Sequence, residues 1–290
     1  MTSKARLDNF KVNHHETLHT SYKAKMEWWR NETDVEKRRC KVCWLRSHQC
    51  YCDVLQQKRS KYEAWDPRPN INVCIYYNPI EIARTANTAH SLEATCPWIC
   101  SNIVYGDLAN ETALLDDIEA EYRENRPQTC IMFPSKDAKL LSEWMGARPV
   151  AQSDKPIRLV MLDGTFPGAS RQAKYLMNCC AVRGIPAPLV KLDLEGDACK
   201  SAVAGVMYQP GKDKICTYQA IVMAMEQAKI DPLFCRSLHQ DLEDWIGYIL
   251  RTKVKLGKSK PRNSMKNEMD VTPTAFIAEA LSVSANLVSH

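Results

Sequence analysis

The stretch "LVMLDGTFPGASRQAKYLM", Leu159–Met177, decides how this chain folds. A short apolar run, Leu159–Leu162, stops at an acid, Asp163, and this pattern predicts a buried strand over residues 158–162. A helix is expected over about residues 171–179, after a Pro-Gly pair that interrupts its entry. A carboxylate, a hydroxyl and two cations therefore follow the exit of a buried strand.

Strands and helices alternate on both sides of this stretch. The pattern predicts strands over residues 72–77, 102–105, 129–133, 158–162 and 191–194. It predicts helices over residues 80–89, 114–125, 136–145, 171–179 and 217–229. This alternation predicts an α/β fold with a mostly parallel sheet and helices on both of its faces.

The chain divides into three predicted segments. Residues 1–66 hold a helix over 17–39 and a cysteine cluster, and a proline-containing linker follows. Residues 67–250 form the α/β domain. Residues 251–290 begin as a basic linker and end as an amphipathic helix with Pro273 at its first position.

Composition and charge indicate a protein that works in a reducing compartment. Of the 290 residues, 45% are hydrophobic and 25% are charged, and 13 are cysteines, an odd number that excludes a complete set of intramolecular disulfides. The sequence contains neither a long apolar run nor a secretory signal, so no membrane association is expected. These features favour the cytoplasm or nucleus and leave the mitochondrion open.

Seven cations and no acid occupy residues 251–266, although the whole chain carries only +5. Such a block binds phosphates by releasing counterions, so RNA contact is one interpretation. A solvated linker is the other.

Several common cofactor motifs are absent from the sequence. It lacks the G-x-G-x-x-G and G-x-x-x-x-G-K-[ST] loops, the H-E-x-x-H helix and the EF-hand loop. Their absence argues against a dinucleotide fold of the Rossmann type and against a phosphate-binding loop. The chemistry is therefore expected to come from other residues.

The cysteine cluster "CKVCWLRSHQCYC" predicts a small zinc module. It supplies four thiols, from Cys40, Cys43, Cys50 and Cys52. Four thiolates satisfy a tetrahedral zinc ion and leave no open coordination position, so the role would be structural. The alternative is that these cysteines pack into a core.

Polar residues follow several predicted strands. Glu81, Arg84 and Asn87 are expected to share one helix face, Ser135 to cap a helix, and Thr217 to begin one. Each of these residues could instead have a purely structural role, in a surface ion pair or as a helix cap. Because ligands bind outside the carboxyl ends of parallel strands, the loops together predict a site at that edge of the sheet.

The cysteine cluster and four further motifs, taken in chain order, resemble the DTW-domain family. The motifs are "NPIEIARTANT", "FPSKDA", "LDGTF…RQAK" and "CTYQA", and the resemblance spans about Cys40–Lys229. It implies a SPOUT-like fold with a C-terminal knot that binds S-adenosylmethionine. It also implies transfer of the 3-amino-3-carboxypropyl group of that donor to N3 of a uridine, in tRNA or alternatively in rRNA. The oligomeric state is left open.

The resemblance also implies roles for individual residues. Asp163 and Thr165 would be catalytic, Asp163 by accepting the N3 proton or orienting the base. Arg84 and Asn87 would line the RNA side, where Arg171 and Lys174 would contact phosphates. The cofactor pocket would be formed by Phe133, Pro134, Ser135, Leu162, Gly164 and Thr217.

The chain departs from the family pattern at several positions. Asn78 stands where the family has His, Phe166 where it has Trp, and Gln219 where it has Glu, and residues 167–170 separate the aromatic residue from "RQAK". These departures leave two alternatives open. One is an inactive RNA-binding or ribosome-assembly factor that keeps the fold, and the other is an S-adenosylmethionine-dependent RNA methyltransferase.

Overall fold

Strand β5 (Ile157–Asp163) lies in the middle of a six-stranded sheet. The computed structural model describes residues 17, 19–32, 39–148, 155–194 and 215–255. The chain divides into two units, residues 1–252 and 253–290, and the sheet belongs to the first. Within the described ranges, no helix combines the length and the apolar character needed to cross a membrane.

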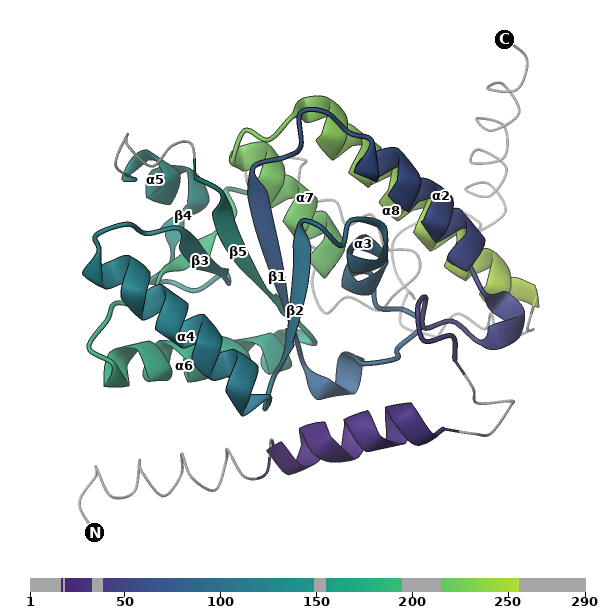
Figure 1. The fold of residues 1–290 in the computed structure, drawn as a ribbon, viewed down its shortest axis with the longest axis horizontal. Helices are drawn as coiled ribbons and strands as arrows, with labels where there is room; N and C mark the ends of the chain where they lie inside the picture. The colour runs from purple at the N-terminus through teal and green to yellow at the C-terminus, as the bar shows by residue number, and fades with distance from the viewer. Residues whose placement is uncertain (1–16, 18, 33–38, 149–154, 195–214, 256–290) are drawn as a thin grey trace, which may run out of the picture. The chain divides into compact units, whose positions relative to one another are not determined.

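All strands of the sheet are parallel, in the order β2-β1-β5-β3-β6-β4 (Figure 1). The other strands are β1 (Ile71–Tyr77), β2 (Cys100–Val104), β3 (Thr129–Met132), β4 (Lys139–Leu140) and β6 (Leu189–Lys191). Tyr77 at the end of β1 pairs with Asp163 at the end of β5, so the two strands end level. Their exit loops therefore meet at one edge of the sheet.

Helices cover both faces of this sheet. They are α2 (Cys52–Glu63), α3 (Ala89–Thr95), α4 (Leu108–Arg123), α5 (Leu141–Gly146), α6 (Phe166–Val182), α7 (Thr217–Gln227) and α8 (Pro232–Lys255), with 3-10 turns at Ser47–Gln49 (η1) and Pro79–Glu81 (η2). A further helix covers residues 19–31.

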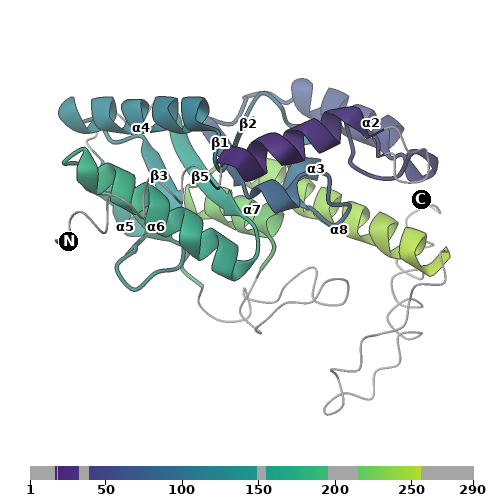
Figure 2. The ribbon, with the colours of Figure 1, turned by 90° about the horizontal axis from the view of Figure 1, so that it is seen from below.

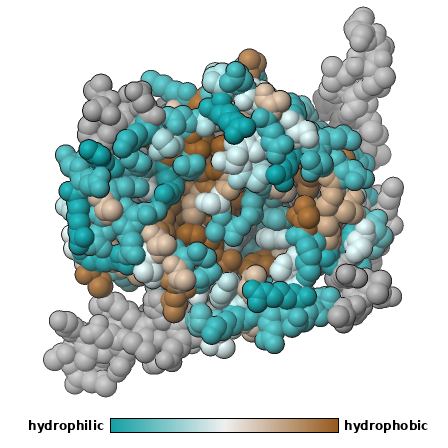
Figure 3. Space-filling view, viewed as in Figure 1, coloured by the Kyte–Doolittle hydropathy of each residue, from teal (hydrophilic) through white to brown (hydrophobic). Residues whose placement is uncertain are grey.

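Alternation along β5 divides the core into two layers. Leu159 and Met161 pack with residues of α3, α5, α7 and α8. Val160 and Leu162 point to the other face and pack with α4 and α6. The predicted α/β fold with a parallel sheet and helices on both faces is confirmed. On the side of the molecule that faces the viewer in Figure 1, hydrophobic side chains are visible in the middle, and mainly hydrophilic ones surround them (Figure 3).

Helices α2 and α8 lie side by side, although the sequence separates them widely (Figure 1). Asp241 on α8 accepts hydrogen bonds from Lys58 and from the Tyr62 hydroxyl on α2, both at 2.6 Å. Nearby, Tyr51 and Leu55 pack against Trp245 and Ile249. The α8 helix thus anchors the segment that carries the cysteines.

The helix predicted over residues 80–89 is wrong. The structure has only the 3-10 turn η2 there, capped by the Asn78 side chain, and α3 begins at Ala89. Ala83 has a positive φ of 63°, which a continuing α-helix cannot accommodate. Glu81, Arg84 and Asn87 therefore do not share a helix face.

The helix predicted over residues 136–145 is also partly wrong. Lys139 and Leu140 are extended and pair with β6, and the helix begins only at Leu141. Ser135 therefore caps no helix. The backbone of this segment pairs with the otherwise open side of β6, and this pairing overrides the helical pattern of its sequence. The local sequence does not reveal such a pairing.

Helix α6 begins at Phe166, five residues before the expected start. The Pro-Gly pair does not interrupt it, because proline suits the first turn, where no backbone donor is needed. Gly168 suits the close packing of this turn: an added Cβ would lie 3.2 Å from Thr165 Oγ1 and 3.3 Å from Asn78 Nδ2.

Other predictions fall wholly or partly outside the described residues. The knot depends on the segment after β6, of which residues 195–214 are not described, and the amphipathic C-terminal helix lies beyond residue 255. Of the basic block, α8 includes Arg251, Lys253 and Lys255, and Arg251 is exposed. The domain boundaries at residues 66 and 250 stay a prediction.

Candidate functional site

Asp163 is the centre of the candidate site. The side chain is 6% exposed, and both of its carboxylate oxygens accept hydrogen bonds. Asn87 Nδ2 donates to Oδ2 at 2.7 Å, and Thr217 Oγ1 donates to Oδ1 at 2.6 Å. Residues from the exit of β1, the end of β5 and the start of α7 thus meet at one carboxylate.

The position of Asp163 follows from strand alternation. It lies two residues beyond Met161, on the face covered by α3 and α7, so it faces the segments that carry Asn87 and Thr217. Burial raises the pKa of Asp163, while the hydrogen bonds from Thr217 and Asn87 and the charges of Arg84 and His90 oppose that rise. The site therefore holds a carboxylate that is more basic than an exposed one.

The loop after β1 adds a second acid and a cation. Glu81 is buried and accepts a hydrogen bond from Arg84 Nη1 at 2.6 Å, and half of the Arg84 side chain is exposed. Burial and the nearby charge of Asp163 raise the pKa of Glu81, whereas the charge of Arg84 and its hydrogen bond act to lower it. Arg84 thus carries positive charge to the surface beside Asp163.

An aromatic pair lies at the neighbouring strand exits, on the other face of the sheet. Phe133 follows β3 and stacks on Phe166, with ring centroids 5.6 Å apart, and 42% of Phe166 is exposed. Leu162 is buried on this same face. In the next loop Pro134 is exposed, and the buried Ser135 Oγ has no hydrogen-bond partner among the described residues.

Thr165 and the two cations lie along the start of α6. The Thr165 hydroxyl accepts a hydrogen bond from Gly168 N at 3.3 Å, so it caps the helix. Gly164 separates it from Asp163, and an added Cβ there would lie 3.3 Å from Asn78 Cβ. Arg171 and Lys174 are exposed.

The predicted site residues therefore form two groups. Direct hydrogen bonds bring Asn87 and Thr217 to Asp163. The predicted cofactor residues Phe133 and Leu162 lie on the α6 side of the sheet. Both groups lie at the carboxyl ends of the neighbouring strands β5 and β3.

The four predicted zinc ligands come together in the cysteine loop, which we define as residues 40–52. Their sulfur atoms lie within 4.8 Å of one another, with Cys40 and Cys52 3.3 Å apart and Cys43 and Cys50 3.9 Å apart. Zinc–sulfur bonds of about 2.3 Å place tetrahedral sulfurs about 3.8 Å apart. The cluster can therefore hold a metal ion such as zinc.

Helix 19–31 lies across the carboxyl edge of β1 and β2 (Figures 1 and 2). His19 contacts the Gly106 carbonyl oxygen at 3.0 Å, and Tyr22 donates to Asp107 at 3.0 Å. At the other end of the helix, the Trp29 ring packs edge-on against Trp44 of the cysteine loop. The helix thus joins the exit of β2 to the cysteine loop.

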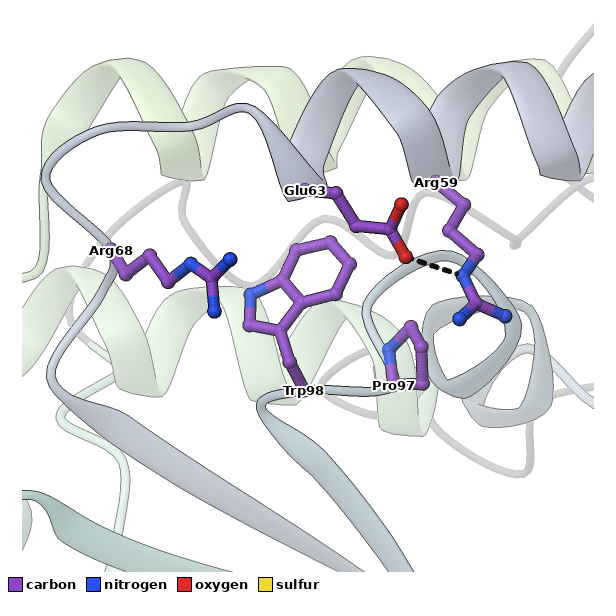
Figure 4. Close-up of a pocket in the computed structure, with 5 residues that line it drawn as sticks. All are labelled: Arg59, Glu63, Arg68, Pro97 and Trp98. Atoms are coloured by element: carbon purple, nitrogen blue, oxygen red, sulfur yellow. Dashed lines mark hydrogen bonds and ion pairs between the residues drawn. The ribbon is translucent and has the colours of Figure 1, made fainter.

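A separate hollow lies near the amino-terminal ends of β1 and β2, away from Asp163 (Figure 4). The Trp98 indole lies between Glu63 and Arg68, and Glu63 forms an ion pair with Arg59. No predicted site residue lines this hollow.

Three residues that lie near the site were not among the predicted site residues. Asn78 caps η2, and the buried Gln172 donates to the Tyr76 carbonyl oxygen at 3.0 Å. His90 donates its backbone N–H to Asn87 Oδ1 at 2.9 Å. The "RQAK" motif contains Gln172, but nothing in the sequence distinguished His90 from an ordinary core residue.

Comparison with known protein families identifies a DTW domain. The DTW domain matches residues 37–252, more than half of the 290-residue chain, and the match covers the cysteine loop, the sheet and most of α8. No curated protein and no solved structure matches the chain. The chain belongs to the DTW domain family, the family of tRNA-uridine aminocarboxypropyltransferases.

Proposed function

We propose that this protein transfers the 3-amino-3-carboxypropyl group of S-adenosylmethionine to N3 of a uridine in tRNA. Family membership supports a tRNA-modifying function. The observation that carries the finer proposal is the buried Asp163, held from two sides at the carboxyl edge of the sheet.

Asp163 accepts the N3 proton of the uridine in this proposal. Each of its oxygens accepts one hydrogen bond from the protein, and a carboxylate has further lone pairs that can receive a proton. Burial raises the pKa of Asp163 and so makes the carboxylate a stronger base. Asn87 and Thr217 fix its orientation, which lowers the entropic cost of reaching the reactive geometry.

The loops around Asp163 fit the donor. S-adenosylmethionine supplies a sulfonium leaving group: the N3–carbon bond forms as the carbon–sulfur bond breaks, and the electron pair remains on sulfur in methylthioadenosine. Phe133 and Phe166 offer an aromatic surface for adenine, and Ser135 Oγ offers a hydrogen-bond partner. Arg84 is suited to hold the carboxylate of the transferred group.

RNA binding would use the exposed cations near the same edge. Arg171 and Lys174 follow the first turn of α6, and with the described residues neither forms an ion pair. Such groups contact phosphates and position the RNA without reading its sequence. The cysteine loop would hold zinc in a structural role.

The test is turnover of purified full-length protein with S-adenosylmethionine and tRNA, with mass spectrometry of the small-molecule product. We expect RNA-dependent methylthioadenosine. Asp163→Asn should lower turnover by about 10²–10⁴-fold, because it removes the base but keeps the shape of the side chain. RNA affinity in a filter-binding assay should stay unchanged.

Asp137→Asn is the matched control, because Asp137 is an exposed acid in the loop after β3. It should leave turnover unchanged. Formation of S-adenosylhomocysteine would instead assign the protein to the methyltransferases. Neither product, together with no binding of S-adenosylmethionine, would favour the assembly-factor alternative.

A further inference from the structure

His90 lies between the cysteine loop and the candidate catalytic acid. It is 8% exposed on α3, and its ring stacks on the Trp44 indole with centroids 3.6 Å apart and an angle of 4° between the planes. Trp44 directly follows the predicted metal ligand Cys43. The stacking therefore places the His90 ring against the turn that presents two of the four sulfurs.

Both ring nitrogens of His90 face acceptors. Nε2 contacts the carbonyl oxygen of Val42, and Nδ1 lies 3.2 Å from Glu93 Oε2. A carbonyl oxygen can only accept a hydrogen bond. Glu93 Oε1 accepts a further hydrogen bond from Asn102 Nδ2, so this carboxylate is held in place beside the ring.

It follows that Nε2 of His90 carries a hydrogen and donates it to the carbonyl oxygen of Val42. Glu93 holds the Nδ1 side of the ring, and the Tyr77 hydroxyl fixes Glu93 by donating to it at 2.9 Å. Because Val42 lies between Cys40 and Cys43, the Nε2 bond holds the backbone of the metal-binding turn directly.

The backbone of His90 continues the connection toward Asp163. Its N–H donates to Asn87 Oδ1 at 2.9 Å, which fixes the orientation of the Asn87 amide. The nitrogen of that amide then points to Asp163 Oδ2, at 2.7 Å. An unbroken series of contacts thus runs from Val42 through His90 and Asn87 to the carboxylate.

We propose that His90 is a positioning residue that couples the cysteine loop to Asp163, so that metal binding and the placement of this carboxylate depend on each other. The part concerning Asp163 rests on the proposed function, whereas the contact with the cysteine loop does not. Coupling between two sites is reciprocal, so weakening the contact should also weaken metal binding.

Two substitutions separate the two hydrogen bonds of the ring. The amide nitrogen of glutamine can replace Nε2 and keep the bond to Val42, and that of asparagine can replace Nδ1 and keep the bond to Glu93. Both retain the backbone bond to Asn87. His90→Asn should therefore disturb the cysteine loop, and His90→Gln should spare it.

The first measurement is the release of zinc from the zinc-loaded full-length chain to a chromogenic chelator. His90→Asn should release zinc about tenfold or more faster than the wild type, the usual effect of losing a partner outside the ligand shell. His90→Gln should release it at close to the wild-type rate. His239→Gln is the control, because His239 pairs with Glu226 at 3.2 Å and is not in the connection to Asp163.

Two further measurements exclude a merely structural effect. Nitrogen-15 NMR of the wild type should show a hydrogen on Nε2 of His90, the nitrogen that contacts Val42. Kinetics should show a lower kcat in His90→Asn with little change in KM for RNA, since positioning of Asp163 changes but the RNA surface does not.

Zinc release at the wild-type rate in folded His90→Asn would overturn the coupling, and so would an Nε2 of His90 that carries no hydrogen in the wild type. If both variants fail to fold, the NMR result on the wild type decides. Failure of the proposed function has a different signature: the wild type would form no product, while the zinc-release and NMR results would remain as expected.

Discussion

At the scale of single residues, Asp163 shows a conflict between stability and the function proposed for it. Its carboxylate is removed from water at the end of β5, and hydrogen bonds from Asn87 and Thr217 replace the lost hydration only in part. The net result is a pKa above the usual value, with burial as the main cause. The folded protein therefore binds a proton at Asp163 more tightly than the unfolded chain does.

Replacing Asp163 should therefore stabilise the protein. Because the folded-state pKa is the higher one, the stability contributed by the protonated acid is complete at low pH and is lost as pH rises through that pKa. Asparagine does not ionise, so Asp163→Asn does not lose this stability as pH rises. At neutral pH the variant should therefore have a higher melting temperature than the wild type. Each kcal/mol corresponds to roughly 2–4 °C.

Thermal unfolding of both proteins across acid and neutral pH measures this difference. The gap should close as pH falls below the usual value for an aspartate, because Asp163 is then protonated in both states. A wild type that is more stable than Asp163→Asn at neutral pH would show that the hydrogen bonds outweigh the cost of burial.

At the scale of elements, the start of α6 decides where the Asp163 loop can lie. Thr165 caps the helix, a proline occupies its first turn, and Gly168 allows the turn to approach Asn78 closely. Further along, Gln172 binds the end of β1 through the Tyr76 carbonyl oxygen. The helix and the loop after β1 thus form one packed unit beside the candidate site.

Thr165→Ala should destabilise the protein by about 0.5–2 kcal/mol, because the Gly168 N–H loses its acceptor. Thr165→Asp should restore most of that stability, since aspartate is also a good N-cap. Urea unfolding measures both effects. Equal stability of the wild type and Thr165→Ala would show that the cap contributes nothing.

At the scale of the whole described molecule, the cysteine loop holds segments that are far apart in the sequence. Tyr51 packs on Trp245 of α8, while Trp44 packs on Tyr77 at the end of β1 and on His90 of α3. A metal ion bound by the four cysteines would therefore stabilise contacts well beyond its own ligands. Metal binding and folding should be coupled.

Removal of zinc should lower the stability of the full-length protein. With free zinc a thousandfold above its dissociation constant, binding contributes about 4 kcal/mol. Calorimetry with and without a chelator should therefore show a melting temperature lower by about 10 °C. Cys43→Ser should lose this dependence on zinc, and added zinc should restore the chelated wild type. An identical melting temperature in both conditions would exclude a stabilising metal.

The helix α8 was not predicted, although a signal for it was present. Phe234, Leu238, Leu242, Trp245 and Ile249 recur at intervals of three or four residues, the spacing of one helix face. All five are buried in the structure. The failure lay in how the sequence was interpreted, not in the sequence.

From the amino-acid sequence alone one can predict the parallel α/β fold, the four clustered cysteines and the acid at the end of β5. These are local properties: apolar runs form strands, and the cysteines lie within thirteen consecutive residues. The three-dimensional structure was needed to show that Asn87, 76 residues from Asp163, is its partner and that Lys139 and Leu140 form a strand. It was also needed to show that His90 contacts both the cysteine loop and Asn87. Such contacts depend on which surfaces meet after packing, and no periodicity along the chain records them.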